Sequence, residues 1–409
     1  MPSHRVDKLL HDQVSALENR NVSKGRELVV SSMIEPTGTN GPRVTLEGYG
    51  TKPFLRFNSN SYLGLSRDRR LVAADERAVR EFGVGPGAVR FISGTYRPHV
   101  TLEQRLAEFF RRDSALIFSS AYSTVISVLA ALTTQDTLVI SDELNHNCII
   151  NALKLTRPKA KQVYRHNKVE ELERHLAGGR GEADRVIVIT DGVFSMRGDM
   201  APLHNIGPIV ERMDDDFPEN VVLMVDDSHG VFCLGDTGRG TEEQCSAKPV
   251  DILIGTLGKA LGVNGGFVVG SDTLIRYLRE TAPMYIYSNP ITTGEAAAAL
   301  EALNIVDSTE GKQRIAALRK LTAQFESGLV SLGFEVIMGP HPVVPLIVRD
   351  TTKTQQMVRH LFQAQILATG LSYPVVPRGD EEIRFQVNAD HTPADIDYVL
   401  SVLADFGAR

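Results

Sequence analysis

Short apolar segments alternate with helical ones from residue 100 to residue 269, and this alternation restricts the fold more than any other feature of the sequence. Predicted strands lie at 115–118, 137–140, 162–164, 185–190 and 221–225. A predicted helix starts near residue 100, before the first of these strands, and others start between the strands near residues 122, 146, 169 and 202. Strands that alternate with helices favour an α/β fold, with a mostly parallel sheet covered by helices on both faces.

Polar side chains follow directly after several of these predicted strands. They are the segment 119–122, His146, Ser195, Asp226 with His229, and Lys259. In parallel sheets of this kind, ligands bind at the carboxyl ends of the strands. We therefore expect these side chains to share one site.

Lys259 lies between two apolar segments, in the sequence DILIGTLGKALGVNGG at 251–266, and a second apolar run follows at 267–269. A buried lysine has a lowered pKa, so its amine becomes a nucleophile that condenses with carbonyl groups. The alternative is a turn lysine whose amine extends into water.

Asp226 and His229 stand three residues apart, just beyond an apolar strand, and three interpretations are open. In the first interpretation they are metal ligands, although no third or fourth ligand is spaced to join them. In the second they belong to a structural turn. Or they surround an aldehyde cofactor held by Lys259, with Asp226 beside a ring nitrogen. The helix that starts near residue 122 would then offer its backbone N–H groups to a phosphate, unless Ser119 or Ser120 merely caps it.

Length and charge narrow the classes of function. A chain of 409 residues has room for a large α/β domain and a smaller one. Its net charge of −6 gives no reason to expect nucleic acid or a membrane surface as a partner. Three cysteines without metal-ligand spacing, and no apolar leader at 1–20, predict a cytoplasmic protein without a metal site. The glycine-rich segment 83–94 lacks the dinucleotide spacing G-x-G-x-x-G.

Three regions are expected along the chain. Residues 1–56 form a helix at 7–20 and a polar arm, and residues 57–291 form the large domain. Residues 292–409 form a smaller α+β domain, with strands at 345–348 and 383–387. Arg384 lies inside the second of these apolar strands, as a ligand for a carboxylate or as part of a structural ion pair.

Taken together, the motifs at 119–122, 144–146, 190–196, 226–230 and 256–259 resemble the α-oxoamine synthases. These are pyridoxal 5'-phosphate (PLP) enzymes of fold type I, the aspartate aminotransferase fold, which join an amino acid to an acyl-CoA. The resemblance extends from about residue 58 to residue 391. Segments 89–95, 191–196, 373–377 and 383–384 are most similar to the branch of 2-amino-3-ketobutyrate CoA ligase, also called glycine C-acetyltransferase.

The resemblance implies a role for each site residue. Lys259 would form the Schiff base with PLP and move the Cα proton. Asp226 would pair with the pyridine nitrogen, His229 would bind the ring hydroxyl, His146 would stack on the ring, and Ser195 would lie close to it. Ala121, Tyr122 and Thr256 would bind the phosphate, together with Ser288 of the partner subunit. Arg384 and Asn60 would bind the carboxylate of the amino acid.

The expected reaction is condensation of a small amino acid, first of all glycine, with acetyl-CoA or a longer acyl-CoA by a homodimer with shared active sites. CoA leaves, with or without carbon dioxide. The short segment after Lys259, with Val263 and Asn264, departs from the acetyltransferase branch, so another α-oxoamine synthase stays open, such as an 8-amino-7-oxononanoate synthase or a secondary-metabolite synthase. An aminotransferase or lyase, and a non-catalytic partner subunit, also stay open.

Overall fold

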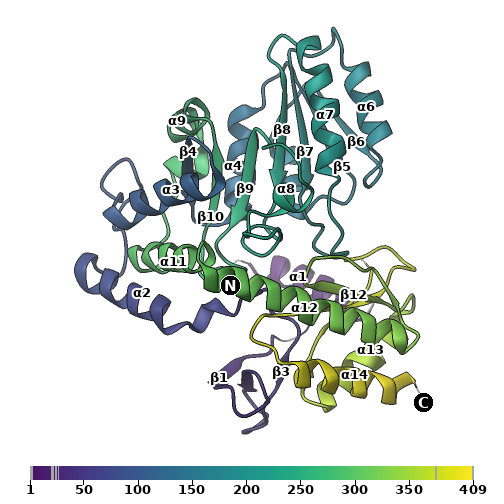
Figure 1. Cartoon of the computed structure of the whole chain (residues 1–409). Coiled ribbons are helices and arrows are strands. Elements are labelled where there is room, and N and C mark those ends of the chain that lie inside the picture. The colour runs from purple at the N-terminus through teal and green to yellow at the C-terminus, as the bar shows by residue number, and fades with distance from the viewer. Residues whose placement is uncertain (1–2, 20–22, 24, 26, 374, 408–409) are drawn as a thin grey trace.

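The computed structural model describes residues 3–19, 23, 25, 27–373 and 375–407, and shows a large α/β domain above a smaller one (Figure 1). The central sheet has the strand order β4-β10-β9-β8-β7-β5-β6. Its strands are β4 (Ser114–Phe118), β5 (Thr137–Asp142), β6 (Ala160–Tyr164), β7 (Arg185–Asp191), β8 (Val221–Asp226), β9 (Ile252–Thr256) and β10 (Gly266–Gly270). Only β10 runs antiparallel to its neighbours in this sheet, so the predicted mostly parallel sheet is confirmed.

Helices cover both faces of this sheet because its strands are apolar on both sides. One face packs against α4 (Ala121–Leu132), α5 (Asn147–Leu155) and α9 (Asp272–Thr281). The other packs against α3 (Arg97–Phe110), α6 (Val169–Gly178) and α7 (Leu203–Met213). Successive residues of β7 alternate between the two cores, with Ile187 in the first and Val188 in the second.

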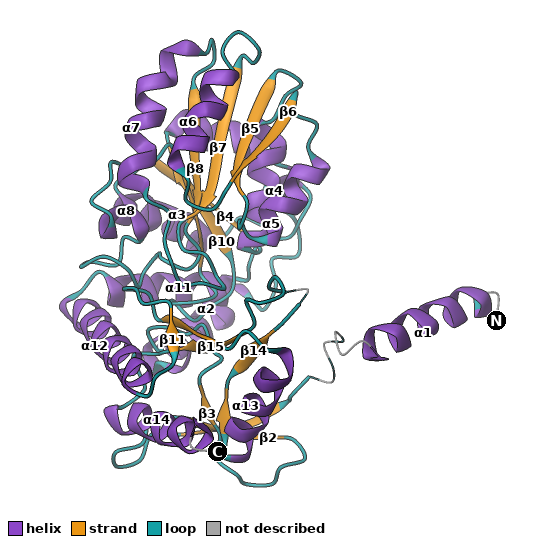
Figure 2. Ribbon diagram, turned by 90° about the vertical axis from the view of Figure 1, so that its right-hand side faces the viewer, coloured by secondary structure: helices purple, strands orange, loops and turns teal. Residues whose placement is uncertain are grey.

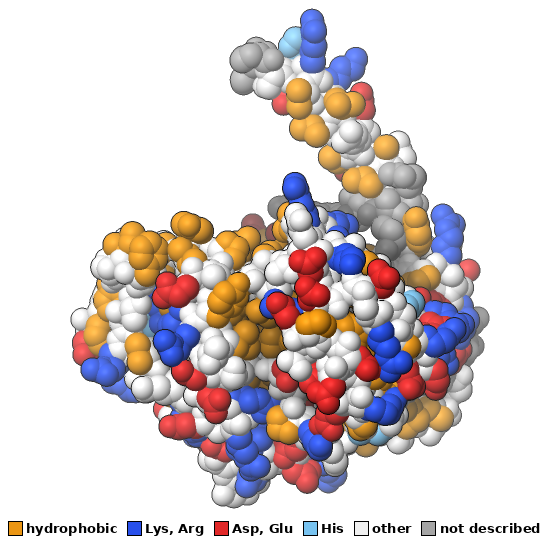
Figure 3. Space-filling model, turned by 90° about the horizontal axis from the view of Figure 1, so that it is seen from above, with side chains coloured by type: hydrophobic (Ala, Val, Ile, Leu, Met, Phe, Trp, Pro, Cys, Tyr) orange, Lys and Arg blue, Asp and Glu red, His pale blue; other side chains and the backbone are white. Residues whose placement is uncertain are grey.

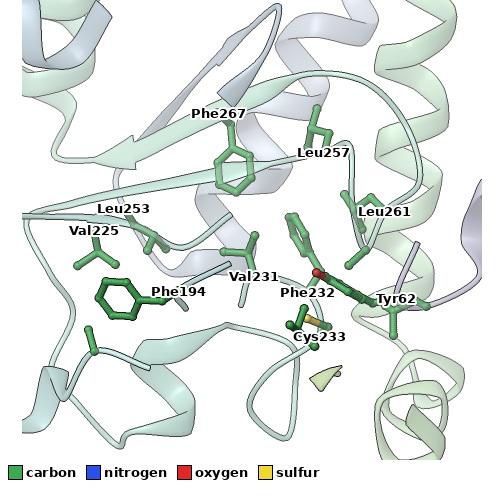
Figure 4. Packing of buried hydrophobic residues seen from close by; sticks show 14 of the residues in the cluster. Tyr62, Phe194, Val225, Val231, Phe232, Cys233, Leu253, Leu257, Leu261 and Phe267 are labelled. Atoms are coloured by element: carbon green, nitrogen blue, oxygen red, sulfur yellow. The ribbon is translucent and has the colours of Figure 1, made fainter. Parts of the chain in front are cut away.

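The second core continues toward the small domain. Figure 4 shows Phe194, Val225 and Leu253 on one side of this cluster and Tyr62 on the other, with Phe232 and Phe267 between. Helices α2 (Arg69–Phe82) and α11 (Thr293–Val306) pack against each other below the sheet. Their contact is close, since a Cβ at Gly294 would lie 2.2 Å from a carboxylate oxygen of Asp75.

The small domain contains an antiparallel sheet of order β11-β12-β15-β14. These strands are β11 (Glu335–Val336), β12 (Val343–Ile347), β14 (Thr369–Leu371) and β15 (Glu382–Gln386), and the helices are α12 (Thr309–Ser331), α13 (Thr351–Gln363) and α14 (Pro393–Gly407). The N-terminal segment joins this domain, because β3 (Leu55–Arg56) pairs in parallel with β13 (Ile366–Leu367). A hairpin of β1 (Val30–Ile34) and β2 (Arg43–Leu46) precedes β3. The predicted domain boundaries after residues 56 and 291 stay predictions.

Helix α1 (His4–Asn19) projects from the body of the molecule (Figure 2). It is the amphipathic helix predicted at 7–20, although residue 20 lies outside the described residues. None of its side chains is buried, and its apolar residues lie open along the helix (Figure 3). Across the described part of the chain, no helix has the length and apolar character that crossing a membrane requires.

Candidate active site

The carboxyl ends of β7, β8 and β9 and the starts of α4 and α5 enclose a cavity of about 230 Å³. It brings together residues that are far apart in the sequence. Its walls contain Ala121, Tyr122, His146, Ser195, Asp226, His229, Thr256 and Lys259 from the sequence prediction. They also contain Cys148 and Asp191, for which the sequence predicted no role.

Two carboxylates lie side by side in this cavity, because Asp191 and Asp226 are paired positions on adjacent parallel strands. Asp226 Oδ1 accepts a hydrogen bond from Ser228 N at 3.1 Å, and its Oδ2 accepts one from Cys148 Sγ at 3.5 Å. Asp191 Oδ2 accepts one from His146 N at 3.0 Å, whereas its buried Oδ1 has no partner. Burial and the neighbouring Asp226 raise the pKa of Asp191 well above its ordinary value. The pair therefore favours a cationic group beside it.

Lys259 is the cation that faces these carboxylates. It stands three residues after β9 in a tight turn, where Gly262 N donates to Lys259 O at 3.0 Å. Gly262 has a φ of 72°, and a Cβ there would lie 2.5 Å from Ser66 N, so the turn requires glycine. Burial lowers the pKa of Lys259, and Asp226 and Asp191 oppose this shift. Such an amine is suited to attack a carbonyl group.

His146 begins α5 and borders the cavity beside Tyr122. Its Nδ1 accepts a hydrogen bond from Cys148 N at 3.3 Å and lies 3.0 Å from Cys148 Sγ. Burial lowers the pKa of His146, so its imidazole is neutral at pH 7. The ring meets Tyr122 edge to face, with centroids 6.3 Å apart. Cys148 therefore contacts both His146 and Asp226.

A chain of hydrogen bonds connects the cavity to Arg384. His229 Nδ1 lies 2.7 Å from the hydroxyl of Tyr62, which donates to Asn60 Oδ1 at 3.2 Å. Arg384 Nη2 donates to the same oxygen at 3.4 Å. Burial, Lys259 and Arg384 all lower the pKa of His229, so this histidine is neutral. Tyr62 was not among the predicted site residues.

Arg384 does not form the structural ion pair that the sequence left open. Within the residues that the structure describes, no carboxylate oxygen lies within 4 Å of its guanidinium, and its buried Nε has no partner. Its Nη1 donates to the Gln386 amide at 2.7 Å, in the amide orientation that also satisfies Phe57 O. Burial lowers the pKa of Arg384. A buried guanidinium without an anion is suited to bind a carboxylate.

The start of α4 forms the opposite end of the cavity. Ser120 caps this helix, since its Oγ accepts from Ser123 N at 3.1 Å. The N–H groups of Ala121 and Tyr122 belong to the first turn, which has no acceptor within the helix. Gly266 allows β10 to approach this turn, because a Cβ there would lie 2.3 Å from Ala121 N. These N–H groups and the positive end of the helix dipole suit a phosphate.

Thr256 and Ser288 have different surroundings. Thr256 ends β9 at the cavity wall, where its Oγ1 donates to Gly265 O and accepts from Gly258 N, both at 3.1 Å. Ser288 does not line the cavity, and its Oγ lies 3.5 Å from Asn289 O. Its neighbour Tyr287 is 81% exposed. The assignment of Ser288 to a second subunit stays a prediction.

Comparisons with known proteins give a consistent family. Residues 52–403 match the model of the class I and II aminotransferases. The 8-amino-7-oxononanoate synthase of Fervidobacterium nodosum is 38% identical, with 98% of each chain covered. That of Bacillus pumilus is 38% identical, over 86% of this chain and 87% of the relative.

Among solved structures, the serine palmitoyltransferase of Sphingomonas wittichii has a TM-score of 0.89 at 24% identity, covering 99% of this chain and 98% of its own. An 8-amino-7-oxononanoate synthase of Francisella tularensis has a TM-score of 0.72 at 22% identity, covering 86% and 97%. At these identities the structures show a shared fold.

Proposed function

The chain belongs to the class I and II aminotransferases, as a PLP-dependent α-oxoamine synthase of fold type I, and we propose that it condenses an amino acid with an acyl-CoA at Lys259. The observation that carries this proposal is the half-buried amine of Lys259, which has a lowered pKa beside two carboxylates. The same cavity offers a helix start for a phosphate and leads to an arginine without an anion.

The relatives belong to a different branch of the family from the one that the sequence motifs favoured. They are named 8-amino-7-oxononanoate synthases, so the findings favour this alternative over glycine C-acetyltransferase. That name describes a nine-carbon chain with an amine next to a ketone and a carboxylate at its far end. Formation of an α-amino ketone from an amino acid requires loss of the amino acid's carboxyl group as carbon dioxide. We assign this loss of carbon dioxide to the reaction of this protein. Its amino-acid substrate is a small amino acid, of which glycine is one candidate.

The cavity fits PLP in three respects. Lys259 matches its aldehyde, the carboxylate pair of Asp226 and Asp191 matches its ring nitrogen, and the first turn of α4 matches its phosphate. When bound there, PLP supplies an electron sink for a carbanion at the amino acid's Cα. Lys259 would hold the cofactor through its aldehyde, and its Nζ would accept and return the Cα proton of the amino acid. Asp226 would bind the ring nitrogen of the cofactor and favour its protonated form.

The other residues of the site bind and orient the cofactor and the amino acid. His229 and Ser195 bind the polar edge of the ring, and His146 covers its face and excludes water. Ala121, Tyr122 and Thr256 bind the phosphate, together with Ser288 of the partner subunit in a homodimer. Arg384 binds the amino acid's carboxylate, with Asn60 beside it. The carboxylate is thereby fixed while Lys259 takes the proton.

Release of CoA tests the proposal directly. The protein should release free CoA from an acyl-CoA only when an amino acid is present, which an aminotransferase or lyase would not do. Lys259→Ala should abolish this release and remove the visible absorbance of the lysine-bound cofactor. Lys248→Ala changes an exposed lysine that pairs with Glu211, and serves as the control with normal turnover. Normal turnover of Lys259→Ala would refute the assignment.

The non-catalytic alternative has no support from the site. Lys259, Asp226, His146 and Arg384 are all present, and the first three line one cavity. A purified protein that neither bound PLP nor released CoA with any amino acid would restore that alternative.

A further inference from the structure

A second cavity of about 360 Å³ lies beside the cofactor cavity, between the large and the small domain. Ser195 lines both cavities, and Asn145 and His146 are neighbours on their shared border. Its walls come from both domains and combine apolar side chains with the charged ones of Glu143, Arg197, Glu335, Arg349, Asp380 and Glu382. We call it the apolar groove, defined by Leu144, Phe194, Met196, Ile337, Ile347 and Val376.

The lining of the apolar groove suits a hydrocarbon chain. Leu144 is 39% exposed, and Met196, Ile337 and Ile347 are partly exposed, so apolar surface remains in contact with water. Val375, which is 45% exposed, adds to this surface from the segment that follows β14. Covering apolar surface is favourable by about 25 cal/mol per Å². A chain that enters beside Ser195 would cover it.

The cations that line the groove are already paired. Arg197 Nε donates to Asp199 Oδ2 at 2.9 Å. Arg349 pairs with Glu335 and lies 4.0 Å from Asp380 Oδ1. An additional carboxylate at this end would bring a third anion to Arg349. Like charges that share a site repel each other.

Glu382 adds an acidic group with an unpaired atom. It lines the groove from β15, is 3% exposed, and its Oε1 has no hydrogen-bond partner. Burial raises its pKa to about 8, although Arg384 and Arg197 oppose this shift. A methyl-terminated chain has no hydration to lose in the groove, whereas a carboxylate-terminated chain would lose the hydration of its charge there.

Resting on the proposed function, we propose that the apolar groove binds the acyl chain of the acyl-CoA and selects a chain without a carboxylate at its far end. The product of this protein would then differ from the one in the name of its relatives, since 8-amino-7-oxononanoate carries a terminal carboxylate. The shared chemistry at Lys259 is unaffected, because the groove acts on the part of the substrate that does not react.

Two acyl-CoAs of equal length test the selection. One carries an eight-carbon chain that ends in a methyl group, and the other an eight-carbon chain that ends in a carboxylate. Amino-acid-dependent release of CoA is measured at pH 7 with the intact holoenzyme. We expect kcat/KM to be at least about tenfold higher for the methyl-terminated substrate, because burying an unpaired charge is costly. An equal or higher kcat/KM for the carboxylate-terminated substrate would overturn the proposal.

Substitutions in the groove test where the chain binds. Ile347→Trp fills the groove from β12, and should lower kcat/KM for the methyl-terminated substrate at least about tenfold more than for acetyl-CoA. Met196→Trp gives the same test from the large domain, in case one variant fails to fold. Val330→Trp changes an exposed position on α12 and is the control. Equal losses for both substrates would place the chain elsewhere.

The two proposals fail in different ways. If no acyl-CoA releases CoA with any amino acid, the proposed function is wrong and the groove assignment falls with it. If CoA is released but the carboxylate-terminated chain is preferred, only the selection by the groove is wrong.

Discussion

The histidine clamp formed by His166, Asp142 and Asp199 should make the stability of the protein depend on pH above neutrality. His166 Nδ1 lies 3.2 Å from Asp142 Oδ1, and its Nε2 lies 3.1 Å from Asp199 Oδ2. Its ring meets Phe194 edge to face at 4.4 Å, and the side chain is 14% exposed. The clamp thus ties β5 to the loop that carries Ser195.

The magnitude follows from the pKa of His166. Burial alone would lower this pKa, but hydrogen bonds to Asp142 and Asp199 outweigh it and raise the pKa from 6.5 to about 9. A raised pKa stabilises the folded state fully below 6.5, and this contribution is lost as pH rises through 9. A shift of this size corresponds to about 3 kcal/mol, of which about 2 kcal/mol disappears between pH 7 and pH 9.

Denaturant unfolding of the wild type and His166→Gln at pH 7 and pH 9 measures this contribution. The neutral glutamine has no proton to lose, so the wild type's advantage in free energy of unfolding should shrink by about 2 kcal/mol between the two pH values. His11→Gln on the exposed helix α1 is the control. A wild-type advantage that is the same at both pH values would refute the charged clamp.

Three further changes test other contacts. Arg384→Ala should raise the KM for the amino acid about 100-fold with a smaller effect on kcat, because it removes charge-assisted hydrogen bonds of about 2–4 kcal/mol; an unchanged KM in steady-state kinetics would contradict its role. Gly266→Ala should weaken PLP binding at least about tenfold in an equilibrium titration, since its Cβ would displace the first turn of α4. Between pH 5 and pH 8 the folded wild type keeps a proton on Glu382, whose pKa is about 8, whereas the unfolded chain releases it. The free energy of unfolding of the wild type should therefore fall by about 2–4 kcal/mol over this range, and Glu382→Gln should not show this fall. Denaturation curves at both pH values give this difference.

The sequence predicted the strands and the polar residues at their ends because both signals are local. A buried parallel strand is a short apolar run, and the residue that follows it lies at the edge of the sheet. Asp226 and Lys259 were found in this way. Helix α2 was missed because its buried face is narrow and consists of Leu71, Ala74 and Ala78. Such a face gives a weak apolar period.

The missed site residues depend on contacts that are distant in the sequence. Tyr62 reaches His229 across 167 positions, and Asp191 meets Asp226 only through the register of β7 and β8. The predicted branch, that of glycine C-acetyltransferase, was wrong for a related reason. Motifs around the cofactor are shared chemistry, whereas the groove that faces the acyl chain is built partly from β12 and the segment 375–382 of the small domain.

The two neighbouring carboxylates divide their roles because their hydrogen bonds differ. Both oxygens of Asp226 accept hydrogen bonds, one from Ser228 N and the other from Cys148 Sγ. Asp191 has an unpaired buried oxygen, and burial together with Asp226 raises its pKa well above the ordinary value. The other oxygen of Asp191 accepts a hydrogen bond from His146 N and so fixes the backbone of this histidine. Asp191 therefore holds the backbone of the histidine in place, and Asp226 is the carboxyl group left to bind a ring nitrogen.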